Sequence, residues 1–411
     1  MGPIALFDKS FLEALNVDEA VLFDYFFYPV ICPVFFVETL GDLDKVQNRG
    51  RRPEDVVGSI AFKSPQMHGG PNTFHRTLVV SNLMGQEVPM RGQIVVSHGI
   101  PVVVEGERHV VLKPSPEREA FDRWQAGDFE QVERLHARQW REQLRTLDLK
   151  SVAAQAMNYG LDFSRCKTLE DAKAFAEHVI SALSPEAQMR FALDKFGLSS
   201  QEREEAMSAW AESGRLNLEQ FAPYAYFVLR LELFFEIALA SGKISADRPS
   251  NFNDLAYLFY LPFCMVFVSS DRLHRFCAPL FLRAGQEFLW GQELKADLRA
   301  NHEALMQLPE ADRLRGLIAL HPSPHPGSQI ALLHDRLLRK RQEGPFAPET
   351  AKRAGELAER IRRLTQAANA HPSAGPGFAP KQADSITIER LLLKRRGSWY
   401  QLPHDYEPAG D

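Results

Sequence analysis

Short apolar runs that end in an acidic residue are the main feature of the hydrophobic pattern. Residues 4–7 form an apolar run that ends at Asp8, and an apolar helix through Phe11 is predicted after it. The fully apolar run 263–268 is too short for a helix and predicts a buried parallel strand, which stops just before Asp271. Because open α/β sheets bind ligands at the carboxyl ends of their strands, both acids are candidate site residues.

Two further acids accompany predicted helices. The apolar run 31–37 leads into Glu38, and we expect a strand there, followed by a helix that begins at or near the acid. Asn253 or Asp254 is a natural N-cap for a helix that runs to Phe259 and that Pro262 ends. The pattern therefore places four carboxylates in equivalent positions on an α/β framework.

The ordered acids resemble the PIN-domain nuclease family. Those proteins are similar in having a first strand that ends in Asp, a second acid on the helix after a short apolar segment, and a closing unit of helix, apolar strand and Ser/Thr-x-Asp. The four acids of this chain fall in the same order: Asp8, Glu38, Asp254 and Asp271, the last within a Ser-Ser-Asp sequence. The resemblance covers roughly residues 1–45 and 225–285, and it departs from the family in the large module inserted between the second and third acids.

The resemblance implies a PIN-like parallel sheet flanked by helices and a divalent-metal-dependent nuclease, with RNA rather than DNA as the substrate. Clustered carboxylates raise one another's pKa unless a cation compensates, and Mg²⁺ or Mn²⁺ prefers such oxygen ligands. A bound cation makes water a stronger nucleophile for hydrolysis of a phosphodiester. We therefore predict that the same four acids are both catalytic and metal-binding.

Five further residues are assigned supporting roles. Asn253 and Ser269 are expected to orient the ligands from the second shell of contacts. Arg248, Arg272 and Arg275 are candidates for holding the substrate phosphate.

The distribution of residue types along the chain predicts a core that is interrupted by an insertion. Residues 1–60 and 225–318 would form the discontinuous nuclease-like core. Between them we expect a β-rich insert over 61–116, with a hairpin of 101–105 and 109–112 joined at Gly106, and a helical insert over 117–224. Residues 319–411 would form a helical, basic C-terminal extension with flexible segments. Within the core, 279–282 would supply the last strand or a helix start.

Composition limits the functional classes. The net charge of −5 and the pI near 6.3 provide no global basic field, which argues against tight nonspecific binding to long nucleic acid. The four cysteines form no Cys-x-x-Cys pair, so a zinc finger is not expected. Cys32 and Cys264 are expected in the core. No secretory signal or membrane-spanning run is predicted, so the expected location is the cytoplasm.

Several alternatives remain open at this level. Asp8, Asp254 and Asp271 occupy places that Asp also favours as a helix cap or turn residue. A PIN-like fold could serve as a catalytically inactive scaffold or RNA-binding module, with the insert contacting a protein partner or a second copy of the chain. A phosphotransferase with a nucleophilic Asp is less well matched, because Asp8-Lys9-Ser10 lacks the second Asp of a DxD sequence. Glu232 and Glu236 share a helix face and could supply a further ligand, with Arg230 neutralising one of them.

Overall fold

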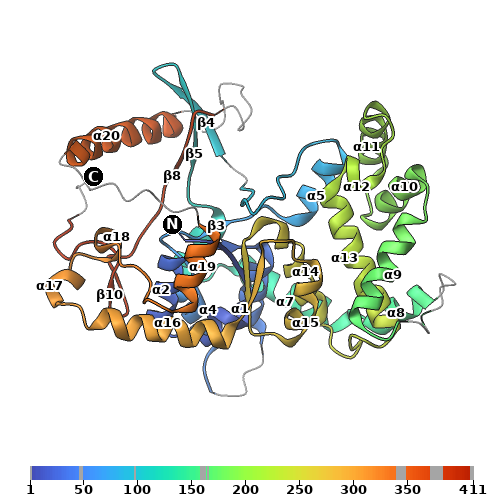
Figure 1. Cartoon of the computed structure of the whole chain (residues 1–411), viewed down its shortest axis with the longest axis horizontal. Coiled ribbons are helices and arrows are strands. Elements are labelled where there is room, and N and C mark those ends of the chain that lie inside the picture. Colours follow the sequence, from blue (N-terminus) through green and yellow to red (C-terminus); the bar gives the residue numbers. More distant parts are fainter. Residues whose placement is uncertain are drawn as a thin grey trace.

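The computed structural model describes residues 2–45, 50–96, 99–157, 163, 166–338, 349–370 and 383–407. Figure 1 shows three regions: a core built around the central sheet, a helical lobe in green at the right, and a small sheet with helix α20 at the upper left. The predicted mixed α/β class is confirmed, since a parallel sheet is flanked by helices. The predicted domain boundaries stay a prediction.

The central sheet is parallel and has the strand order β3-β2-β1-β6-β7. Ala5 pairs with Pro29 on one side and with Val266 on the other, so β1 lies between two neighbours. Its residues Ala5, Leu6 and Phe7 have no exposed surface, which explains a continuous apolar run without alternation. The strands are β1 (Ile4–Phe7), β2 (Tyr28–Ile31), β3 (Gly70–Pro71), β6 (Val266–Ser269) and β7 (Glu287–Trp290).

Helices with well-formed N-termini follow these strands. Asp8 caps the first helix by accepting the N–H of Phe11, and Asn16 and Glu19 form a reciprocal capping box at the second. The helices of the core are α1 (Lys9–Ala14), α2 (Val17–Phe26), α3 (Pro33–Leu40), the 3₁₀ turn η1 (Gly41–Asp44), α4 (Pro53–Lys63), α14 (Asn251–Leu258), the 3₁₀ turn η3 (Leu261–Phe263), α15 (Arg272–Phe281) and α16 (Gly291–Met306).

The predicted position of Glu38 relative to the strand is wrong. The strand is β2 and ends at Ile31, whereas 33–40 are helical, so Glu38 lies inside α3 and not at its start. Pro33 is the reason: at the first position of a helix its missing N–H costs nothing and its fixed φ suits helical backbone. Pro29 is tolerated within the short strand β2.

The later core elements also begin at other residues than predicted. Helix α14 starts at Asn251 with Ser250 as its N-cap, so Asp254 lies within the first turn and does not cap the helix. Strand β6 begins at Val266, because Pro262 lies in the 3₁₀ turn η3 before it. Residues 279–281 belong to α15, and the last strand of the core is β7.

The β-rich insert is confirmed only in part. Strands β4 (Gly99–Val104) and β5 (Glu107–Leu112) form the expected antiparallel hairpin, in which Glu105 and Gly106 both take positive φ. Another part of the expected β-rich insert is helical and forms α5 (His75–Leu83). Helix and strand are hard to distinguish over so short an apolar run.

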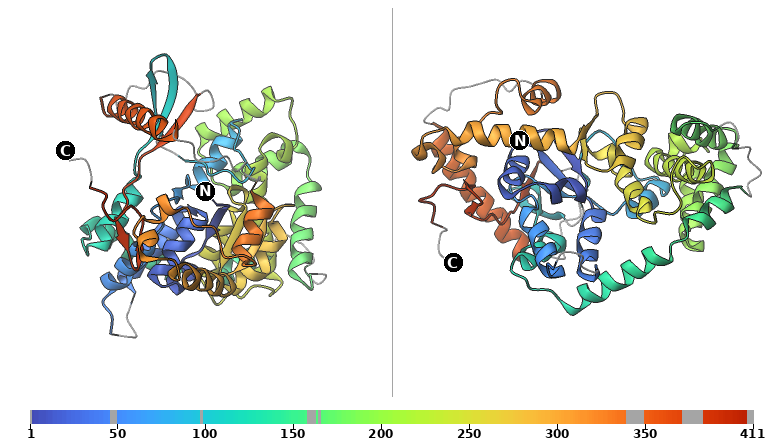
Figure 2. Two further views of the ribbon diagram at one scale, coloured as in Figure 1. Left: turned by 60° about the vertical axis from the view of Figure 1, so that its left-hand side comes forward. Right: turned by 90° about the horizontal axis from the view of Figure 1, so that it is seen from below.

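The helical lobe follows the expected order. The side chains of Thr168 and Ser184 cap two of its helices, α9 and α10. Gly127, with a φ of +75°, separates α6 from α7. Figure 2 shows α7 and α8 reaching from the core to the lobe. The helices of this part are α6 (Pro116–Gln125), α7 (Gln131–Thr146), α8 (Leu149–Met157), α9 (Leu169–Ser181), α10 (Pro185–Lys195), α11 (Ser200–Glu212), α12 (Leu218–Phe221) and α13 (Pro223–Ala240).

The C-terminal part returns to the body of the protein. Strand β8 pairs in parallel with β5 and completes a three-stranded sheet, on which α20 packs. The elements are α17 (Glu310–Arg313), α18 (Leu317–Leu320), α19 (Gln329–Leu337), α20 (Glu349–Ala370), β8 (Ser385–Ile388), β9 (Arg395–Arg396) and β10 (Trp399–Tyr400).

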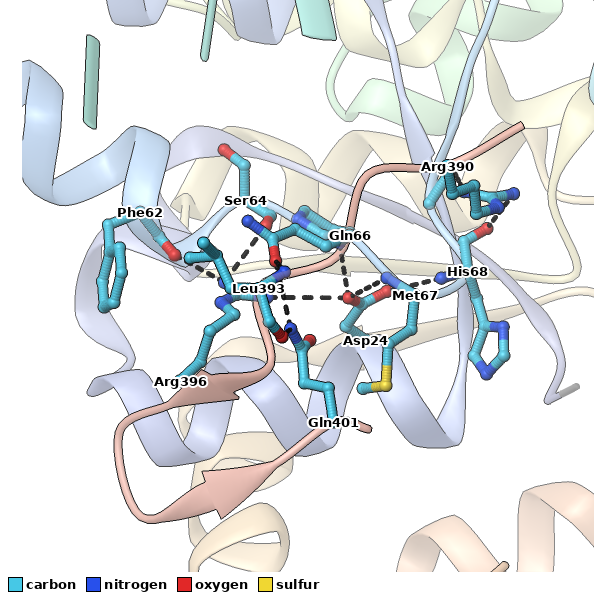
Figure 3. Close-up of polar contacts among 12 residues, drawn as sticks. Asp24, Phe62, Ser64, Gln66, Met67, His68, Arg390, Leu393, Arg396 and Gln401 are labelled. Carbon is cyan, nitrogen blue, oxygen red and sulfur yellow. Dashed lines mark hydrogen bonds and ion pairs between the residues drawn. The ribbon is translucent and has the colours of Figure 1, made fainter. Parts of the chain in front are cut away.

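Arg396 anchors this last segment. Its guanidinium donates to the carbonyls of Phe62 and Ser64 and lies 3.7 Å from a carboxylate oxygen of Asp24 (Figure 3). Arg396 has no exposed surface, and Trp399 is 1% exposed. Burial lowers the pKa of Arg396 to about 10, although the charge of Asp24 opposes that shift. Arg396 and Trp399 therefore contribute to the core of the protein, whereas Arg395 is exposed.

Candidate active site

Asp8 lies at the carboxyl end of β1 and is almost completely buried. One of its oxygens accepts the N–H of Phe11 at 3.0 Å, and the other accepts the hydroxyls of Ser10 at 2.6 Å and Ser269 at 2.8 Å. Burial alone would raise the pKa of Asp8, but the hydrogen bond and charge of His274 outweigh it and lower the pKa. Asp8 is therefore a fixed, ionised carboxylate.

Ser269 joins Asp8 to a histidine that the sequence analysis did not identify. The only proton of the Ser269 hydroxyl is used toward Asp8, so the Nδ1–H of His274 donates to Ser269 Oγ at 2.8 Å. The other ring nitrogen, Nε2, lies 2.7 Å from the backbone carbonyl of Asp254 and also donates. Both ring nitrogens carry protons in this network, so His274 is an imidazolium. Burial opposes this charge, but Asp8 and Asp254 raise the pKa of His274 to about 9.

Glu38 approaches the same strand edge from helix α3. The hydroxyl of Tyr257 donates to its Oε2 atom at 2.8 Å, and the backbone N–H of Lys9 donates to that hydroxyl. Burial raises the pKa of Glu38; Lys9 and Tyr257 lower it, and the charges of Asp8 and Asp42 raise it further. Glu38 and Asp8 therefore interact electrostatically.

Asp254 is the carboxylate with the least compensation. Among the described residues, none makes a hydrogen bond with its side chain, which projects from the first turn of α14. Burial raises its pKa to about 7; His274 opposes this shift, whereas the charges of Asp271, Glu38 and Asp8 add to it. This mutual repulsion shows that all four predicted acids share one electrostatic environment.

Asp271 caps helix α15 directly after β6. Its Oδ1 atom accepts the N–H of Leu273 at 2.6 Å, and its own N–H donates to Ser269. Part of the Asp271 side chain stays exposed. The acid thus stands at the solvent side of the cluster formed by Asp8, Glu38, Asp254 and Asp271, which we call the acidic cluster.

Of the five supporting residues, the structure brings only Ser269 into contact with an acid of the cluster. Asn253 lies beside Asp254 in α14, and its side chain makes no hydrogen bond with the four acids. Arg248, Arg272 and Arg275 are exposed, and none forms an ion pair with these acids. Arg275 instead lies over the ring of Trp290, 4.9 Å from its centroid.

A divalent cation matches this site in the kind of donor it offers. The donors are carboxylate oxygens, and the side chain of Asp254 makes no hydrogen bond with any described residue. However, among the described residues no three His, Cys, Asp or Glu side chains form a group that could hold a metal ion. Two internal cations already compensate part of the charge: His274, and Lys9, which pairs with Asp42 at 2.7 Å.

Sequence analysis missed three residues of the site, namely His274, Lys9 and Tyr257. His274 occurs three positions after Asp271 and continues along α15 as Cys277, Ala278 and Phe281, which is the buried face of that helix. A histidine on an apolar face next to an acid could have been noticed. Lys9 and Tyr257 offer no comparable signal, because their partners are distant in sequence.

The remaining candidate residues have other partners. Glu236 pairs with Lys195, and Arg230 pairs with Glu177 rather than with either glutamate of its own helix. Burial raises the pKa of Glu232 to about 7. Cys32 and Cys264 lie in the core as expected.

Two further findings concern the whole chain. None of the helices in the described ranges combines the length and the apolar character needed to cross a membrane. Comparisons with protein-family models, curated proteins and solved structures found no match to this chain.

Proposed function

We propose that this chain is a divalent-metal-dependent nuclease that hydrolyses phosphodiester bonds in RNA. The observation that supports the proposal best is the convergence of the acidic cluster at the ends of β1 and β6, where burial and the charges of the other three acids raise the pKa of Asp254. Uncompensated carboxylates at this edge of a parallel sheet favour binding of a hard cation. The choice of RNA comes from the resemblance to the PIN-domain family.

The residues of the cluster would have different roles. Asp8 is held by Ser10 and Ser269 and would be the fixed ligand. Glu38, Asp254 and Asp271 would complete the ligand set, with Mg²⁺ or Mn²⁺ as the cation. When bound, the cation supplies Lewis acidity that favours attack of water on the phosphodiester. His274 would keep Asp8 ionised, because its positive charge lowers the pKa of that carboxyl.

The test is cleavage of labelled single-stranded RNA and DNA with Mn²⁺, Mg²⁺ or a chelator. Native protein is compared with Asp8→Asn, Asp271→Asn and the matched control Glu232→Gln, which removes an acid outside the cluster. We expect cation-dependent cleavage of RNA that is lost in the first two variants and kept in the control. Cleavage that survives in both cluster variants would refute the assignment.

A catalytically inactive, PIN-like RNA-binding scaffold is the second candidate. It is favoured by the two internal cations, since Lys9 and His274 already neutralise charge that a metal would neutralise. This candidate predicts binding of RNA without cleavage under any cation. It also predicts that Mn²⁺ leaves the melting temperature unchanged.

A further inference from the structure

Helix α7 carries four arginines on one face. Their spacing of four, three and four positions keeps them within one stripe of the helix: Arg134, Arg138, Arg141 and Arg145. The side chains of Arg138 and Arg145 are 73% and 60% exposed. Arg134 and Arg141 pair with Glu54 and Asp42 at 2.8 and 2.7 Å, so Arg138 and Arg145 supply the positive charge that the stripe presents to solvent, although the chain as a whole is acidic.

The middle of α7 is fixed against the turn that borders the acidic cluster. Arg141 donates to the carbonyl of Gly41 at 2.8 Å and to the carboxylate of Asp42 at 2.7 Å. Asp42 is also the partner of Lys9, the residue after Asp8. The ring of Trp140 packs so closely on Gly41 that an added Cβ would lie 2.3 Å from it. Direct contacts therefore hold the arginine stripe against η1, and η1 is linked to the neighbour of Asp8 through the Asp42–Lys9 pair.

A hollow of about 340 Å³ lies beside this stripe, and we call it the α7 groove. It is open to solvent, and its size suits one nucleotide-sized group rather than a duplex. Ser250, the N-cap of α14, forms part of its wall, and Asp254 lies in the first turn of that helix. The groove is lined by Asp44, Lys45, Arg141, Leu144, Arg145, Pro249 and Ser250.

The charges in the groove favour an anionic ligand. Three cations and one carboxylate line it. The carboxylate, Asp44, lies 3.6 Å from Arg145 and 4.0 Å from Arg138. Such exposed ion pairs contribute little to stability, so both arginines can exchange Asp44 for a phosphate at small cost. Leu144 and Pro249 add apolar surface against which a ribose or base can pack.

We propose that the α7 groove binds the phosphate backbone of single-stranded RNA and directs it toward the acidic cluster. This inference rests on the proposed function, because RNA bound in the groove would be cleaved at the acidic cluster beside it. Arg138, Arg145 and Lys45 contact successive phosphates, and Arg141 maintains the position of α7. Single-stranded backbone is contacted in this way by basic grooves that have apolar or aromatic surface beside the charges.

The test measures binding separately from cleavage. A fluorescein-labelled single-stranded RNA is titrated with protein in EDTA at several KCl concentrations, with fluorescence anisotropy as the signal. We expect Arg138→Glu/Arg145→Glu to weaken binding about tenfold or more and to reduce the slope of log K against log salt by about 1.4, since each single-strand phosphate contact contributes roughly 0.7. Lys45→Glu, on a different element, should weaken binding in the same direction.

The matched control reverses two exposed arginines elsewhere, Arg190→Glu/Arg362→Glu. Both lie on helices, and each loses one exposed ion pair, so the change in net charge is the same as in the groove variant. Equal weakening by this control, unchanged binding in the groove variant, or no binding by the native protein would overturn the inference. Binding through the groove without cleavage would support the groove and refute the nuclease. Cleavage that is unaffected in the Arg138→Glu/Arg145→Glu variant would support the nuclease and refute the groove.

Discussion

The Nδ1 atom of His274 lies 3.5 Å from the Oδ2 atom of Asp8, and the two side chains are 0% and 3% exposed. Ser269 bonds to both and holds them in this arrangement. A buried cation thus stands beside the carboxylate at the end of β1, and each side chain shifts the pKa of the other toward the charged state.

The first prediction concerns the dependence of stability on pH. The folded pKa of His274, about 9, lies above the unfolded value of 6.5, so its contribution is complete below pH 6.5 and is lost as the pH rises through 9. We expect the native protein to lose on the order of 3 kcal/mol of unfolding free energy over this interval from this group. Urea unfolding at pH 6 and pH 9.5 measures the loss. His274→Gln should remove its largest part and keep only the smaller loss below pH 7 from Asp254 and Glu232, whose pKa values burial raises to about 7.

The control for this experiment is His178→Gln, which changes an exposed histidine on α9. It should retain the native dependence on pH. A His274→Gln protein that loses as much stability as the native protein between the two pH values would show that His274 is not the titrating group.

The second prediction concerns the C-terminal anchor. Replacing Arg396 by Met removes the partner of buried Asp24 and leaves the carbonyls of Phe62 and Ser64 without a donor. We expect the free energy of unfolding to fall by about 3 kcal/mol. This is the lower end for a broken buried ion pair, because Asp24 still accepts three backbone N–H groups. Arg395→Met is the control, since that neighbour is exposed, and it should lose less than about 0.5 kcal/mol in urea unfolding.

Features that depend on residues close together in the sequence were predicted better than features that depend on residues far apart in it. The strand at 4–7 is a local feature and was predicted correctly, and the cap at Asp8 is one of the alternatives that the sequence left open. Glu38 was placed in the cluster but on the wrong part of its element, because the helix-starting role of Pro33 was not recognised.

Long-range partners could not be predicted from local pattern. Strand β8 pairs with β5 across 276 residues, as the bond between His109 and Ser385 illustrates. The protonated state of His274 depends likewise on the contact between α14 and α15, which brings the carbonyl of Asp254 to its ring. Neither arrangement leaves a periodic signal in the sequence.

The third prediction tests how α7 is positioned. The ring of Trp140 fills the space that a side chain at position 41 would need. Gly41→Ala should therefore lower the free energy of unfolding by about 1–3 kcal/mol through overpacking, although the backbone at Gly41 is helical and accepts alanine. In a Trp140→Ala background the same change should cost almost nothing. Urea unfolding of the four proteins gives the coupling energy, and additive effects would contradict the contact.

The last prediction separates repulsion in the acidic cluster from binding of a cation. The pKa of Asp254 is raised to about 7, so its ionisation costs stability as the pH rises from 3.8 to 7, and the cost persists above pH 7. In EDTA at pH 8, Asp254→Asn should therefore be more stable than the native protein by up to about 4 kcal/mol. Addition of Mn²⁺ stabilises the state that binds it, so the native melting temperature should rise more than that of the variant.

Glu232→Gln is the matched control, because burial also raises the pKa of Glu232 to about 7 while its neighbours are Lys195 and Glu236 rather than the cluster. It should be stabilised in EDTA at pH 8 and should keep the full native response to Mn²⁺. If Mn²⁺ raises the melting temperatures of native protein and Asp254→Asn equally, Asp254 is not a ligand, and its raised pKa reflects burial and repulsion alone. The repulsion acts whether or not a cation binds, whereas the difference in the Mn²⁺ response arises only if the carboxylate contacts the ion.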